Sequence, residues 1–154
     1  MAPGTGNLQT GPKAVEGNAT TMTQTSQDKS LYERLGGYDA IAAATDDLLL
    51  GRLVNDPLLG VYWKGKSEDS LRRDRQLIVD FLVQAAGGPG FYFGRDMRTS
   101  HTRLGITDGE WQIFMGHTRA MLAHLSVPER EGQEVLGFFE SLKADVVQAH
   151  TVSV

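Results

Sequence analysis

The 154-residue sequence contains no cysteine. This absence excludes disulfides, thiolate metal sites, iron–sulfur clusters and thiol nucleophiles. A metal ion would have to be held by histidine, aspartate or glutamate. The sequence also has no excess of positive charge, because 15 lysines and arginines against 19 acidic residues give a net charge of −4. A nucleic acid is therefore not expected as a partner.

Long hydrophobic runs are missing as well. No stretch approaches the roughly 18 consecutive apolar residues of a membrane-spanning helix, and the first residues lack a basic region followed by an apolar one. We expect no membrane partner and a cytoplasmic location. Residues 1–29 are rich in Gly, Thr, Gln, Asn and Ser and hold no aromatic residue. They are predicted to form a disordered polar tail before a single domain at 30–150.

The pattern within the domain is helical. Ser30 with Glu33 and Thr107 with Glu110 have capping-box spacing, and strand-like alternation is nearly absent. The sequence predicts an all-α fold of four substantial helices and two short ones. Their approximate ranges are 30–35, 38–54, 67–86, 98–103, 107–125 and 128–146.

Histidines are the only neutral metal ligands in the sequence. Glu110, His117 and His124 recur every seven residues, a spacing of about 10.5 Å along a helix, so they cannot share one ion. They are predicted to be partly exposed helix residues, and His150 lies near the expected helix end. His101 differs because it lies between a glycine-rich aromatic loop and a turn into a helix.

The segment around His101, residues 94–107 (GRDMRTSHTRLGIT), resembles the proximal haem segment of group I truncated haemoglobins. Other motifs of that family follow in order: SLYERLGG at 30–37, DP at 56–57 with YWKG at 62–65, and GGP at 87–89. The resemblance extends from about Ser30 to Val147.

This resemblance implies a two-over-two helical sandwich around haem b, with His101 as the proximal iron ligand. An imidazole suits that role, and its other ring nitrogen is expected to donate to a carbonyl or another acceptor. Arginines of the third helix, or Arg95 and Arg98, are candidate partners of the haem propionates. The implied haem contacts are Leu49, Tyr62, Trp63, Ile78, Leu82, Tyr92, Met97 and Ile106, with Phe91 and Phe114 as further candidates to cover its faces.

The distal side departs from the family pattern. Group I members usually place a tyrosine on the second helix and a glutamine on the third, and these positions fall at Leu49 and Ile78. A connector about three residues longer than usual leaves the register open, so Gln76 is an alternative to Ile78. Either Tyr62 or Trp63 occupies the position of the usual phenylalanine. In the simple register the distal pocket is apolar.

These features predict a haem protein that reversibly binds dioxygen, carbon monoxide or nitric oxide, for oxygen transport, scavenging or sensing. A nitric oxide dioxygenase or peroxidase-like haem enzyme is the alternative, and a reductase is an expected partner. A third hypothesis is a haem-free helical interaction module that kept the fold.

Overall fold

The computed structural model describes residues 29–147, and within this range it contains helices and no strand. Nearly all of the predicted tail, together with His150, lies outside the described residues. The elements are α2 (Leu31–Leu35), α3 (Tyr38–Thr45), the π-helix η1 (Asp46–Leu53), the 3₁₀-helix η2 (Leu59–Trp63), α4 (Glu68–Ala85), α5 (Met97–His101), α6 (Asp108–His124) and α7 (Glu129–Val146).

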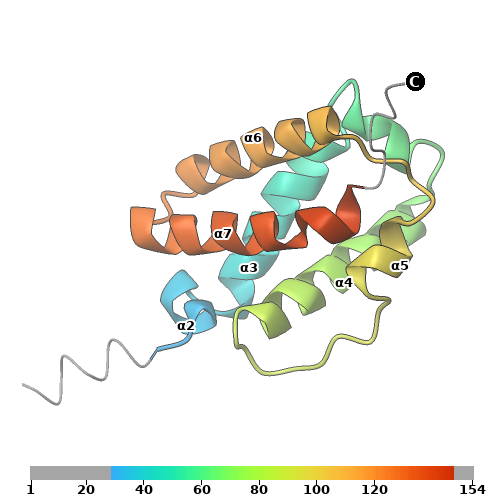
Figure 1. The fold of residues 1–154 in the computed structure, drawn as a ribbon. Helices are drawn as coiled ribbons and strands as arrows, with labels where there is room; N and C mark the ends of the chain where they lie inside the picture. The colour runs from blue at the N-terminus through green and yellow to red at the C-terminus, as the bar shows by residue number, and fades with distance from the viewer. Residues whose placement is uncertain (1–28, 148–154) are drawn as a thin grey trace, which may run out of the picture.

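Two pairs of long helices form the two layers of the fold. Helices α6 and α7 run side by side, and α3 with α4 forms the second pair beneath them (Figure 1). The short helix α5 packs against α7, while α2 contacts both α3 and α7. The predicted all-α sandwich is confirmed.

Three helices begin directly after a residue whose side chain caps them. The Ser30 and Ser67 hydroxyls accept hydrogen bonds from the backbone N–H groups of Glu33 and Ser70. Thr107 and Glu110 form a complete, reciprocal capping box at the start of α6. These bonds satisfy N–H groups that have no partner within the first turn. The predicted starts are therefore confirmed at all three places.

The helix predicted over residues 38–54 is present, but its type changes within the range. The α-helix ends at Thr45, and the chain continues as a π-helix from Asp46 to Leu53. Two ion pairs involve residues of the π-helix. Asp47 pairs with Arg52 within the π-helix, and Asp46 pairs with Arg75 of α4. The three-to-four apolar spacing does not reveal this change, and π-helical turns are often found at functional sites.

The buried residues form three clusters. One contains Leu48, Leu49 and Leu53 of η1 and contacts α6, and a second is centred on Trp111, Met115 and Phe139. A third joins α3 to α4. None of the helices in the described range combines the length and hydropathy needed to cross a membrane.

Candidate functional site

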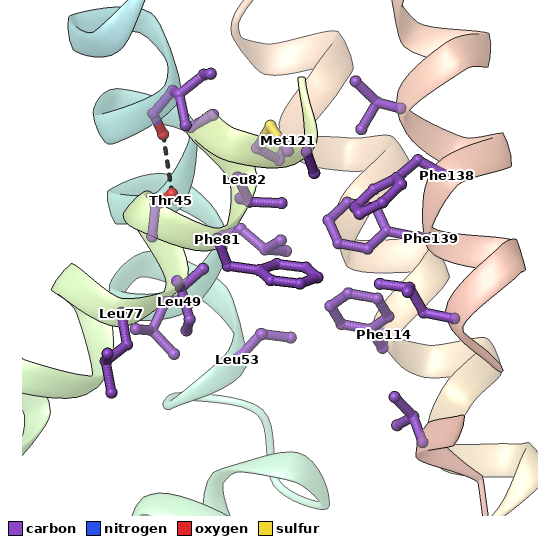
Figure 2. Close-up of a pocket in the computed structure, with 18 of the residues that line it drawn as sticks. Thr45, Leu49, Leu53, Leu77, Phe81, Leu82, Phe114, Met121, Phe138 and Phe139 are labelled. Carbon is purple, nitrogen blue, oxygen red and sulfur yellow. Dashed lines mark hydrogen bonds between the residues drawn. The ribbon is translucent and has the colours of Figure 1, made fainter. Parts of the chain in front are cut away.

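A cavity of about 660 Å³ lies between the two helix layers. Its walls are almost entirely apolar: Leu49, Leu53, Phe81 and Leu82 face Phe114, Phe138 and Phe139 across it (Figure 2). Protein interiors are normally close-packed, and binding sites for small molecules and cofactors occupy roughly 300–1,000 Å³. The cavity is thus large enough for a sizeable apolar ligand.

All nine residues predicted from the sequence line this one cavity: Leu49, Tyr62, Trp63, Ile78, Leu82, Tyr92, Met97, His101 and Ile106. Phe114 lines it too, but Phe91 does not. The side chain of Phe91 is outside, at 76% exposure, while neighbouring Tyr92 turns inward and packs on Phe81 at a centroid distance of 5.3 Å. Successive residues of an extended loop face opposite ways, which explains why only Tyr92 reaches the cavity.

His101 is held by its own short helix. Asp96 caps α5 by accepting a hydrogen bond of 2.7 Å from the Thr99 backbone N–H. The Nδ1 atom of His101 lies 2.8 Å from the Met97 carbonyl oxygen. The Ser100 hydroxyl lies 2.9 Å from the same nitrogen. Since a carbonyl only accepts, the contact with Met97 fits the neutral tautomer that carries its hydrogen on Nδ1 and its lone pair on Nε2. The imidazole is therefore oriented with Nε2 in the form that coordinates a metal.

The other two histidines of the described part lie outside the cavity lining. His117 Nε2 is 2.7 Å from Asp56 Oδ2, and His124, whose side chain is 65% exposed, is 3.7 Å from Asp47. The Glu110 carboxylate accepts a hydrogen bond from Tyr62. The three seven-spaced residues therefore do not form a shared metal site. Residues 29–147 also contain no cluster of three or more His, Asp or Glu side chains able to hold an ion.

Leu49 of η1 and Ile78 of α4 both line the cavity, and Leu49 is only 1% exposed. Gln76 is exposed, and its side-chain amide donates to Tyr38 at 3.1 Å and Asp80 at 2.9 Å. The Thr45 hydroxyl, which also lines this wall, donates to the Ile41 carbonyl at 2.9 Å (Figure 2). Its hydrogen is thus engaged within the helix.

A hydrogen bond joins Tyr62 and Glu110, which both line the cavity. The Tyr62 hydroxyl donates to Glu110 Oε2 at 2.6 Å. Burial, followed by the hydrogen bond and charge of Glu110, raises the pKa of Tyr62 to about 12. Trp63 contacts the Tyr62 ring edge-on, with centroids 6.4 Å apart. From the sequence, Glu110 was predicted to cap a helix and was rejected as a metal ligand, and no spacing indicated its pairing with Tyr62.

None of the arginines considered for the propionates lines the cavity. Arg75 binds Asp46 instead, and Arg98 binds Asp145. The cation that lines it is Lys66, which pairs with Asp74. Lys66 lies in the connector between Gly65 and α4, where the sequence left the register open, and the sequence did not indicate it as a cavity residue.

The donor set fits a flat, largely apolar group that carries a metal and carboxylates. One imidazole with a free ring nitrogen faces a cavity with apolar walls, and a lysine lies at its edge. Apolar walls suit the macrocycle, an imidazole suits iron, and a cation suits a propionate. Fold and cavity together define the class of small helical haem proteins.

The comparisons agree with this class. The chain belongs to the bacterial-like globin family, whose model matches residues 30–148. It is 33% identical to the group 1 truncated hemoglobin LI410 of Chlamydomonas moewusii over 132 residues, 84% of this chain and 75% of that protein. It is 27% identical to the group 1 truncated hemoglobin GlbN of Mycolicibacterium paratuberculosis, covering 79% of this chain and 86% of the relative.

Solved structures give the same fold. The 2/2 hemoglobin of Synechococcus, in the cyanomet state and with covalently attached heme, aligns with a TM-score of 0.69 at 26% identity, covering 77% of this chain and 98% of that chain. The truncated hemoglobin of Tetrahymena pyriformis aligns with a TM-score of 0.70 at 23% identity over the same shares. The resemblance to group I truncated haemoglobins is therefore confirmed, and the family cofactor is haem iron.

Proposed function

We propose that this chain reversibly binds a diatomic gas at a haem iron held by His101. The observation that carries the proposal is the orientation of His101: it lines the apolar cavity, and its Nδ1 is engaged by the Met97 carbonyl. Haem supplies an iron at which dioxygen, carbon monoxide or nitric oxide binds. The Met97 carbonyl fixes the imidazole tautomer, and the apolar walls exclude water.

The distal side is proposed to lack a strong hydrogen-bond donor. Leu49 and Ile78 have no polar atom in their side chains, and the Gln76 amide is bonded outside the cavity. A hydrogen bond to a partly charged acceptor contributes about 1.5–3 kcal/mol. Its absence favours fast release of dioxygen, whereas the less polar carbon monoxide loses less. This supports reversible binding over a nitric oxide dioxygenase or peroxidase-like activity, which depends on polar groups at the ligand.

Absorption spectra of the purified protein test the proposal. We expect a haem spectrum that changes on reduction with dithionite and again on addition of carbon monoxide. An absent haem spectrum would support the haem-free module instead. Fast dioxygen release with a high ratio of carbon monoxide to dioxygen affinity is expected. More than one nitrate per haem, formed from nitric oxide and dioxygen with a reductant that returns the ferric iron to the ferrous state, would favour the dioxygenase.

Two substitutions test the distal wall directly. Leu49→Tyr places a hydroxyl on the cavity side of η1 and should slow dioxygen release by about tenfold, since each 1.4 kcal/mol is a factor of ten. Gln76→Leu is the matched control on α4, and it should leave dioxygen release unchanged because Gln76 is bonded outside the cavity. Faster release in Gln76→Leu would contradict the apolar distal wall.

Lys66 is proposed to pair with a propionate in competition with Asp74, because it is the cation that lines the cavity. A cytoplasmic location and a reductase that keeps the iron ferrous complete the proposal. Oxygen transport, scavenging and sensing all use the same reversible step, and the physiological gas decides among them.

A further inference from the structure

Two hydroxyl groups line the cavity near Leu49, and each donates to an acceptor of the protein. The Thr45 hydroxyl donates to a backbone carbonyl of its own helix. The Tyr62 hydroxyl of η2 donates to a side chain, Glu110 Oε2 of α6. A side-chain acceptor is removable by one substitution, so the position of Tyr62 depends on Glu110.

Tyr62 packs against the buried cluster that contains Leu49, as Ile78 does. Glu110 comes from the first turn of α6. The contact therefore directs the Tyr62 hydroxyl toward the start of α6. Tyr62 is half-buried, and a half-buried phenol that loses its acceptor needs another partner, because an unsatisfied donor away from water is costly.

We infer that Glu110 is a positioning residue that holds the Tyr62 hydroxyl away from the gas ligand and thereby sets the ligand preference of the distal pocket. This inference rests on the proposed function. In the described structure the Tyr62–Glu110 bond commits the Tyr62 hydroxyl to an acceptor of the protein. When the bond is broken, the Tyr62 hydroxyl is free to donate to a polar ligand in the cavity that it lines.

Glu110 also has a structural role, which the experiment must separate from the positioning role. Its Oε2 atom accepts from the Thr107 backbone N–H at 3.3 Å, and its own N–H donates to the Thr107 hydroxyl at 3.2 Å. Thr107→Ala removes part of this capping box and leaves the Tyr62–Glu110 contact in place. It is therefore the matched control for loss of capping.

The test is a double-mutant cycle on the full haem-loaded chain. Glu110→Ala should slow dioxygen release by about tenfold and lower the C–O stretching frequency of the carbon monoxide complex, because the Tyr62 hydroxyl now donates to the ligand. Both changes should vanish when Tyr62→Phe is added. Thr107→Ala should leave dioxygen release and the C–O stretch at their wild-type values. Ultraviolet resonance Raman of the gas-free protein should show that the donor state of one tyrosine changes in Glu110→Ala.

Two outcomes would overturn the inference. One is a wild-type rate and C–O stretch in Glu110→Ala despite the changed tyrosine Raman signal. The other is an altered rate that persists with Tyr62→Phe. If Glu110→Ala fails to fold, Glu110→Gln keeps the cap and replaces a charge-assisted bond with a weaker neutral one. Glu110→Gln should slow dioxygen release by about threefold, less than Glu110→Ala does. An unchanged rate of dioxygen release would reject the positioning role. Absence of any gas complex in the wild type would instead reject the proposed function.

Discussion

At the scale of single residues, a backbone carbonyl one helical turn away orients the His101 ring. The acceptor of its Nδ1–H group is the carbonyl of Met97, four residues earlier, at 2.8 Å. Met97 is the first residue of α5, and its carbonyl also accepts a hydrogen bond from the Ser100 hydroxyl at 3.1 Å. The carbonyl of the first residue of the helix therefore fixes the tautomer of the last one.

His101→Ala should release haem much faster than the wild type, because it removes the proposed bond between protein and iron. Transfer of haem to an excess of apomyoglobin measures the rate. His124→Ala, at a largely exposed side chain outside the cavity lining, is the control and should keep the wild-type rate. Added imidazole should restore a six-coordinate or five-coordinate imidazole spectrum to His101→Ala. Unchanged haem retention in His101→Ala would show that another residue holds the iron.

Asp56 is a second residue with a decisive local role. Its carboxylate contacts His117 at 2.7 Å and accepts from the backbone N–H groups of Leu58 and Leu59 at 2.8 and 2.9 Å. The hydrogen bond with His117, followed by these backbone bonds, lowers the pKa of Asp56. Asp56 thus ties α6 to the connector that carries Tyr62 and Trp63.

Asp56→Asn tests the charge while an amide oxygen keeps the backbone bonds. Because the folded pKa is lowered, the ionised form stabilises the fold above the unfolded pKa. That stability is lost as the pH falls through the lower folded pKa. Urea unfolding should therefore give Asp56→Asn a lower midpoint than the wild type at neutral pH, and the two should converge below about pH 4. Asp69→Asn, at an exposed position, should change little at either pH.

At the scale of elements, α5 is a helix too short to be stable alone, so its cap decides how firmly His101 is held. Asp96 accepts from both the Thr99 backbone N–H and the Thr99 hydroxyl. Asp96→Ala removes both bonds, which should loosen α5 and accelerate haem loss by a smaller factor than His101→Ala.

Asp96→Asn supplies the control, because asparagine caps helices about as well as aspartate. It should restore haem retention measured by the same transfer to apomyoglobin. A wild-type rate in Asp96→Ala would show that packing of α5 on α7, rather than the cap, positions the histidine.

Local signals predicted the elements well where one side chain decides the structure. The starts at Ser30, Ser67 and Thr107 were predictable because each needs only one residue of the right type. The π-helix was not, since α- and π-turns bury the same leucines and differ in backbone bonding. The Tyr62–Glu110 contact was not predictable either, because it joins residues 48 positions apart.

At the scale of the whole molecule, cofactor and fold are linked by the cavity. Four aromatic side chains, Phe81, Phe114, Phe138 and Phe139, line it from three helices and pack on one another around its centre (Figure 2). A compact domain gains stability from close packing, and a group that fills this cavity adds apolar contacts to both layers. Stability and cofactor binding should therefore rise together.

Haem removal should lower the melting temperature of the chain. A ligand that binds only the folded state stabilises it by about 2.7 kcal/mol at a hundredfold excess over its dissociation constant, and for a domain of this size we expect a shift of about 10 °C. Iron-free protoporphyrin IX separates the two contributions, because it fills the cavity without forming a bond to His101. Differential scanning calorimetry should give a partial shift with protoporphyrin IX in the wild type and in His101→Ala alike. Haem should exceed protoporphyrin IX only in the wild type, where the imidazole coordinates the iron; an equal excess in His101→Ala would place the iron bond elsewhere.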